Sequence, residues 1–224
     1  MIDGHQTDHF RLPLIKDIFT GETQCFSMLL DNIVTMETRN GQPYRTGQFA
    51  LTPKEYERVL DACTSLEDEV LIKFTVATGL RREDVVNVEL QNITIDSTTG
   101  SPTGKVRYFE KKKGNRIREV PIGGKLAQLI IKYQKTLPKA QTTLFRFSGR
   151  TAHRYLQRLC DTAQIPRRPF HALRATCIKR CQAAGWTPEE VCELTGDTLR
   201  VIQEHYATPS EGQMRETAVQ KETI

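Results

Sequence analysis

The chain has 224 residues, of which 26% are charged and 38% are hydrophobic, and its formal net charge is +5. This length suffices for one large domain, or for one domain and a short appendage, with a buried core. The composition excludes a collagen-like chain and a typical disordered chain. No apolar run is long enough to cross a bilayer, and no signal segment follows Met1, so we expect a cytoplasmic protein without a membrane partner.

Six cysteines occur, and none of them forms a Cys-x-x-Cys pair. Most occupy apolar positions of predicted helices, so we expect reduced core residues rather than disulfides. Cys177 and Cys181 lie four residues apart, but no histidine at ligand spacing accompanies them. His5 and His9 lie in a polar stretch. We therefore expect no metal site.

Residues 1–50 differ from the rest of the chain because they are polar and interrupted by glycine. They contain one short predicted helix, from Met28 to Val34, and end in a basic linker. From Leu51 the pattern becomes mainly helical, and we expect a main domain over residues 51–210 and a polar tail over 211–224.

Capping boxes and apolar periodicity locate the helices. Thr52 to Glu55 is a capping box with proline at the first helical position, and a similar box opens the helix near Thr187. Helical spacing of apolar residues predicts helices over about 53–63, 65–79, 81–87, 124–133, 149–163, 168–184, 187–195 and 198–206.

Between these helices the periodicity changes to that of strands. Residues 88–95, 105–110 and 116–122 predict a three-stranded antiparallel meander, with turns at Thr99-Gly100 and Lys113-Gly114-Asn115. The predicted fold class is therefore α+β, mainly helical, with a small antiparallel sheet at one edge.

Two basic features suit an anionic partner. Arg81 follows Thr78-Gly79-Leu80 at the start of a helix, beside free backbone N–H groups. Residues 104–118 carry seven lysines or arginines against one acid on a predicted hairpin, which matches a phosphate backbone. Taken singly, each is more typical of an ordinary solvated surface than of a site.

Two further features lie near the C-terminus. His171 and Arg174 are three residues apart and share one helical face, and Tyr206 follows Gly196-Asp197 by nine residues. Taken singly, these residues are more typical of a core or its edge than of a site.

Together, the order and spacing of these residues resemble the phage-integrase, or tyrosine recombinase, family. Thr78 to Asp84 resembles the first family box, and Lys113-Gly114-Asn115 the hairpin with the family lysine. The sequences HALR and GD-x8-Y resemble the second box and the nucleophile region. The resemblance covers about residues 51–210 and implies the catalytic domain of that family.

The resemblance implies a site-specific recombinase that breaks and rejoins DNA. Tyr206 matches the nucleophile that attacks a DNA phosphate and forms a 3′-phosphotyrosyl bond, without metal, ATP or another cofactor. Arg81 and Arg174 match the arginines that bind the non-bridging phosphate oxygens, where negative charge grows in the transition state.

Proton transfer is implied for two further positions. Lys113 matches the general acid for the leaving 5′-oxygen, with Lys111 and Lys112 as alternatives in the same run, and His171 matches a proton-handling residue. Asp84 matches an acidic position that braces Arg81.

Asp197 departs from the family, which usually has histidine or tryptophan there. A carboxylate repels a phosphate, so we expect Asp197 to cap the following helix or to pair with Arg174; a pair with Lys113 and a protonated carboxyl are the alternatives. This departure motivates a second hypothesis, a DNA-binding protein of the same fold with impaired catalysis.

Double-stranded DNA is the expected partner, bound with strong salt dependence. The resemblance implies a nucleoid-associated homotetramer on paired DNA sites, with a monomer without DNA as the alternative. Residues 1–50 are shorter than the usual partner domain, so we expect a catalytic fragment or a reduced segment. The residues expected to bind DNA are Lys111, Lys112, Arg116, Arg150, Arg154, Arg158, Arg167 and Arg168.

Overall fold

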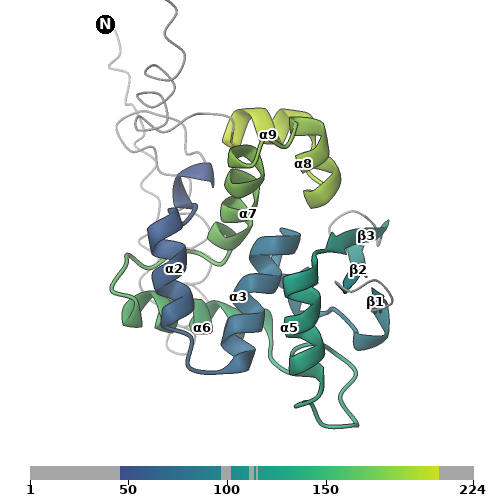
Figure 1. Cartoon of the computed structure of the whole chain (residues 1–224). Helices are drawn as coiled ribbons and strands as arrows, with labels where there is room; N and C mark the ends of the chain where they lie inside the picture. The colour runs from purple at the N-terminus through teal and green to yellow at the C-terminus, as the bar shows by residue number, and fades with distance from the viewer. Residues whose placement is uncertain (1–45, 97–101, 111–113, 115, 207–224) are drawn as a thin grey trace, which may run out of the picture. The chain divides into compact units, whose positions relative to one another are not determined.

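The computed structural model describes residues 46–96, 102–110, 114 and 116–206, all within the unit Arg45–Ile224. Figure 1 shows helices gathered beside a small sheet. In chain order the described elements are η3 (Thr46–Phe49), α2 (Pro53–Asp61), α3 (Leu66–Thr78), α4 (Arg82–Val86), η4 (Leu90–Asn92), β1 (Ile93–Asp96), β2 (Thr103–Glu110), β3 (Arg116–Ile122), α5 (Gly124–Gln134), α6 (Gly149–Thr162), α7 (His171–Ala183), α8 (Pro188–Thr195) and α9 (Leu199–His205).

The helix starts follow the capping residues. Both predicted capping boxes form, with Thr52 and Glu55 at α2 and with Thr187 and Glu190 at α8. Helix α3 is buried almost all round, and its apolar residues fill the core that α5, α6 and α7 share. This explains why its apolar residues occur on several sides of the helix rather than in a narrow stripe.

The sheet has the order β1-β2-β3 and is antiparallel throughout. One face of β2 and β3 is buried by alternate residues, while Phe109 and Ile117 form an exposed cross-strand pair on the other. The α+β class and the three-stranded sheet predicted from the sequence are confirmed.

The predicted first strand is wrong over residues 88–92. The carbonyl of Val88 accepts from Leu144, and Leu90 N–H donates to the carbonyl of Thr142, so this backbone pairs with a distant loop and then turns into η4. Local periodicity carries no signal for that pairing.

Helix α7 begins at His171 rather than near 168. Pro169 disfavours helical geometry for Arg168, which explains the later start. The predicted helix near Met28, the turn at Thr99-Gly100 and the tail lie outside the described residues.

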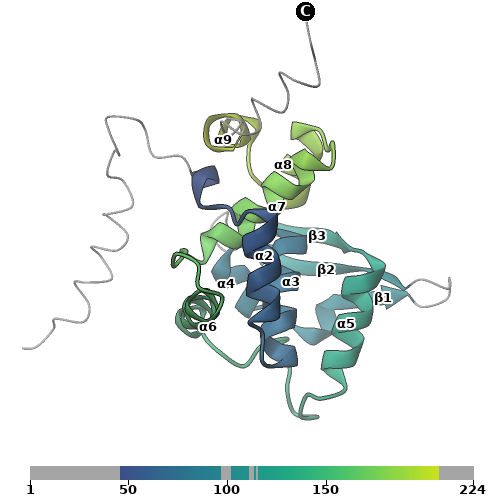
Figure 2. The ribbon, with the colours of Figure 1, turned by 60° about the vertical axis from the view of Figure 1, so that its left-hand side comes forward.

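Helices α7, α8 and α9 bring the end of the described chain back to the core. Figures 1 and 2 show α8 and α9 side by side at one end of α7. Seven consecutive residues of α7, from Ala172 to Ile178, are buried, so this helix can hold a side chain deep inside the molecule.

Over the described part of the chain, no helix is both long and apolar enough for a membrane crossing.

Candidate active site

The ends of two helices fix the two predicted phosphate-binding arginines. Gly79 ends α3 in a left-handed conformation (φ 64°), which turns the chain so that Arg81 becomes the N-cap of α4. Arg174 is only 2% exposed and donates to the carbonyls of Gly79 (2.5 Å) and Thr195 (2.9 Å). These carbonyls lie at the C-terminal ends of α3 and α8, where a cation is favoured.

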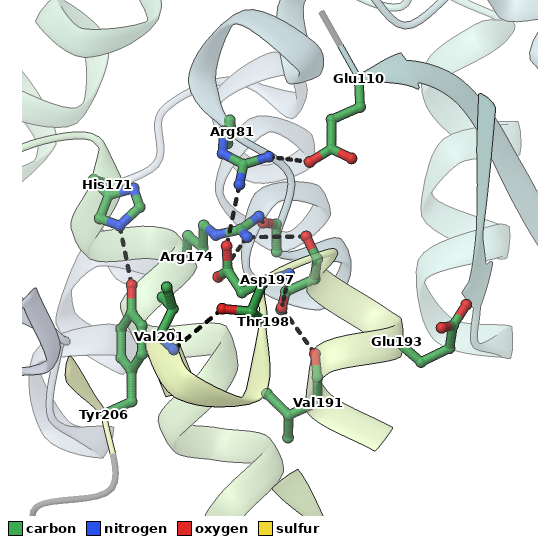
Figure 3. A network of polar contacts seen from close by, with 12 residues as sticks. Arg81, Glu110, His171, Arg174, Val191, Glu193, Asp197, Thr198, Val201 and Tyr206 are labelled. Carbon is green, nitrogen blue, oxygen red and sulfur yellow. Dashed lines mark hydrogen bonds and ion pairs between the residues drawn. The ribbon is translucent and has the colours of Figure 1, made fainter. Parts of the chain in front are cut away.

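A carboxylate bridges the two arginines. Asp197 Oδ1 lies 3.1 Å from Arg81 Nη2, and Asp197 Oδ2 lies 2.6 Å from Arg174 Nη2 (Figure 3). Asp197 therefore pairs with Arg174, one of the expected alternatives. The expected cap is wrong, because Thr198 caps α9 by accepting from the N–H of Val201.

Glu110 is a second partner of Arg81 that sequence reasoning missed. It ends β2, is fully buried and accepts a hydrogen bond from Arg81 Nη1. The sequence did indicate that Glu110 is special. It is the single acid of the basic hairpin, and the alternation of side chains along the strand places it on the inward face. Only the fold shows that Arg81 lies opposite it.

Three carboxylates raise the pKa of Arg81 although burial opposes that shift. Burial lowers the pKa, but the hydrogen bond to Glu110 and the negative charges of Asp197, Glu110 and Asp84 outweigh it. Asp84 is buried in α4, so it acts on Arg81 through its charge. The hydrogen bonds of the Arg81 guanidinium go to Glu110 and Asp197 instead.

Tyr206 lies in the same cluster, directly after α9. Its side chain is 2% exposed, and its Oη lies 3.0 Å from Nε2 of His171, at the start of α7 (Figure 3). Lys179 Nζ donates to the backbone carbonyl of Tyr206 at 2.6 Å. Hydrogen bonds therefore hold the tyrosine at both its phenol and its backbone.

The phenol of Tyr206 is protonated at neutral pH. Burial raises its pKa to about 12, and the charge of Asp197 adds to the rise, whereas Arg174, a hydrogen bond with Thr46 and Arg81 oppose it. A group with this pKa needs a proton acceptor before it can act as a nucleophile.

The raised pKa of Tyr206 predicts a specific loss of stability at alkaline pH. The folded chain holds the phenolic proton up to about pH 12, whereas the unfolded chain releases it near pH 10. The stabilisation is complete below pH 10 and is lost as pH rises toward 12, by about 2 kcal/mol. Urea unfolding of the wild type and of Tyr206→Phe at pH 9 and pH 12 measures this. An equal loss in both proteins would contradict the prediction.

The short η3 segment covers the backbone of Tyr206. A Cβ placed on Gly47 would lie 2.6 Å from the carbonyl oxygen of His205 and 3.3 Å from the Cα of Tyr206. Just after η3, Leu51 N–H donates to Thr176 Oγ1 of α7 at 2.8 Å. The sequence indicated a linker here and did not reveal this contact.

The structure places the other predicted residues outside this cluster or does not describe them. Lys111, Lys112 and Lys113 lie outside the described residues. Arg116, Arg150 and Arg154 are exposed. The remaining three predicted DNA-binding arginines each form an ion pair within the protein: Arg158 with the buried Asp68, Arg167 with Asp161, and Arg168 with Glu55.

Groups of three or more histidine, cysteine, aspartate or glutamate side chains that could hold a metal ion are absent from the described ranges. The cysteines described there, Cys63, Cys160, Cys177, Cys181 and Cys192, are free thiols.

Residues 50–211 match the family model described as "Phage integrase family". This chain belongs to the phage integrase family. It is 31% identical over 127 residues to tyrosine recombinase XerA of Saccharolobus solfataricus; the match covers 57% of this chain and 40% of XerA. The chain therefore spans well under half the length of that relative.

Solved structures share the fold of the family. The chain is similar to the crystal structure of XerA recombinase, with a TM-score of 0.64, 18% identity, and coverage of 76% of this chain and 64% of that one. It is similar to XerH recombinase in a pre-cleavage complex with its difH substrate, with a TM-score of 0.61, 16% identity, and coverage of 87% and 63%.

Proposed function

We propose that this chain carries the catalytic part of a site-specific tyrosine recombinase that breaks and rejoins double-stranded DNA through a 3′-phosphotyrosyl intermediate. The convergence of four side chains from separate elements carries the proposal. Arg81, His171, Arg174 and Tyr206 come from the start of α4, from α7 and from the end of α9, and they meet in one cluster.

The contact between the Tyr206 phenol and His171 supports attack by the tyrosine. Tyr206 Oη attacks phosphorus, its proton passes to His171 Nε2 at 3.0 Å, and the bond to the 5′-oxygen breaks. The new phosphotyrosyl bond replaces the phosphodiester, so the strand can be rejoined by the reverse reaction without ATP or a metal. Lys113 is proposed to protonate the leaving oxygen.

Arg81 and Arg174 would stabilise the transition state. The non-bridging oxygens carry more negative charge there than in the ground state, so two fixed guanidinium groups favour the transition state over the ground state. Their fixed position is the structural basis of this role, since Arg174 is held by two helix ends and Arg81 by Glu110.

The proposed partner is double-stranded DNA, bound by a homotetramer on paired sites in the nucleoid. Residues 51–210 would form the catalytic domain, with residues 1–50 leading into it and residues 211–224 reaching a neighbouring subunit. The similarity to XerH, which is described in complex with difH, supports the DNA partner.

The alternative, a DNA-binding protein of the same fold with impaired catalysis, is motivated by Asp197. This carboxylate occupies both arginines that would hold the phosphate. Under this alternative the protein binds DNA and forms no covalent bond to it.

Covalent trapping separates the two hypotheses. Nicked duplexes tiled across the DNA that flanks the gene are incubated with the protein, and we expect a protein–DNA adduct that resists denaturation. Tyr206→Phe should abolish the adduct, because it removes only the attacking oxygen. Tyr133→Phe is the matched control, since Tyr133 is also buried but bonds to Glu67. DNA binding without an adduct in any duplex would contradict the proposal.

A further inference from the structure

The charge balance of the arginine cluster is unusual for a phosphate site. Arg81 and Arg174 together carry two positive charges, while Asp197 and Glu110 bring two negative charges into contact with them. A phosphodiester that enters this cluster adds a further negative charge. Binding is therefore opposed unless one carboxylate leaves.

Asp197 is the carboxylate that stands where the phosphate would bind. Its two oxygens contact one guanidinium each, which is the arrangement that two non-bridging phosphate oxygens would adopt between the same arginines. Of the two site arginines, Glu110 contacts Arg81, and it is fully buried at the end of β2. Asp197 therefore occupies the position of the phosphate, whereas Glu110 holds Arg81 in place.

A second position for the Asp197 side chain lies next to it. A hollow of about 290 Å³ borders Gly196, Asp197 and Thr198 and is also lined by Arg116 and Arg118. Arg81 and Arg174 are not among its lining residues, so a carboxylate that turned into the hollow would leave both site arginines.

Arg118 offers a partner at that second position. It lies in β3, is only 7% exposed and packs on Gly196, where a built Cβ would be 3.1 Å from its Nε. Its Nη2 donates to the carbonyl of Glu193, but its buried Nε has no hydrogen-bond partner among the described residues. A buried donor of this kind favours an incoming acceptor.

We propose that Asp197 is an internal competitor for the phosphate site. Its carboxylate holds Arg81 and Arg174 in the free protein, and an entering phosphate displaces it toward Arg118 Nε. This rests on the proposed function only in assigning the two arginines to phosphate. It also accounts for an aspartate in a phosphate site, since the carboxylate keeps the arginines in place until the anion arrives.

Inorganic phosphate tests the proposal without DNA. It is titrated into ¹⁵N-labelled full-length protein while the Nε–Hε signals of Arg81 and Arg174 are followed. If the carboxylate occupies the arginines for at least nine tenths of the time, Asp197→Asn should bind phosphate about tenfold more tightly or better. Glu57→Gln is the control, because Glu57 is exposed on α2 and its loss changes the net charge equally. We expect it to leave the affinity almost unchanged.

The variants also separate competition from simple positioning. If Asp197 only positions the arginines, Asp197→Asn will bind phosphate no better than wild type, which overturns the proposal. Arg118→Gln should weaken phosphate binding in the wild-type background but not in Asp197→Asn, because it removes only the second position of the carboxylate. An equal effect in both backgrounds would also overturn it. A protein that binds phosphate as expected but forms no adduct with DNA leaves this inference standing and rejects the recombinase function.

Discussion

Replacement of Arg174 by alanine should abolish formation of the covalent DNA adduct and destabilise the protein by about 3–5 kcal/mol. The guanidinium satisfies the carbonyls of Gly79 and Thr195 and pairs with Asp197, all in a buried position. Without it, two helix ends lose a donor, and Asp197 keeps only Arg81 of its two arginine partners. The stability loss alone does not test catalysis, so a second variant is needed.

Arg174→Lys supplies that second variant. Lysine keeps the charge but has one nitrogen, which cannot reach both carbonyls and a phosphate at once. We expect adduct formation to slow about 100-fold or more, with a smaller stability loss. Arg180→Ala on the same helix is the matched control, since Arg180 is exposed and stacks on Tyr56. Thermal unfolding and single-turnover cleavage measure both effects. Cleavage by Arg174→Lys at the wild-type rate would contradict the role assigned to Arg174.

The features that sequence could predict are those set by neighbours along the chain. The capping boxes at Thr52 and Thr187 specify helix starts through bonds within four residues, and both occur as predicted. The alternation of β2 and β3 likewise follows from side-chain direction in a strand. Such signals fixed most of the element boundaries and hence the fold class.

The features that sequence could not predict depend on residues far apart in the chain. The backbone of Val88 pairs with the loop at Leu144, so the first strand begins at Ile93 instead of residue 88. Glu110 is 29 positions from Arg81, and no spacing rule connects them. The pair between Asp197 and Arg174 was among the expected alternatives, but only the fold shows that Asp197 and Glu110 both contact Arg81.

Gly47 is the position where a small change should most directly disturb the nucleophile. An added Cβ would lie 2.6 Å from the carbonyl oxygen of His205, a backbone atom that cannot move without shifting Tyr206. Gly47→Ala should therefore displace the Tyr206 phenol from His171 and reduce adduct formation about 10- to 100-fold, because attack requires close alignment. We also expect a stability loss of about 1–3 kcal/mol from overpacking.

Gly123→Ala is the control for Gly47→Ala, because no atom lies within 4 Å of a Cβ built there. It should cleave DNA at the wild-type rate. Affinity for the duplex should be the same in both variants, since the strain at Gly47 acts on the tyrosine and leaves Arg81 and Arg174 in place. Fluorescence anisotropy measures that affinity, and single-turnover trapping measures the rate. Wild-type cleavage by Gly47→Ala would show that η3 does not position the nucleophile. Reduced cleavage with unchanged affinity would instead show that η3 positions Tyr206 for the reaction.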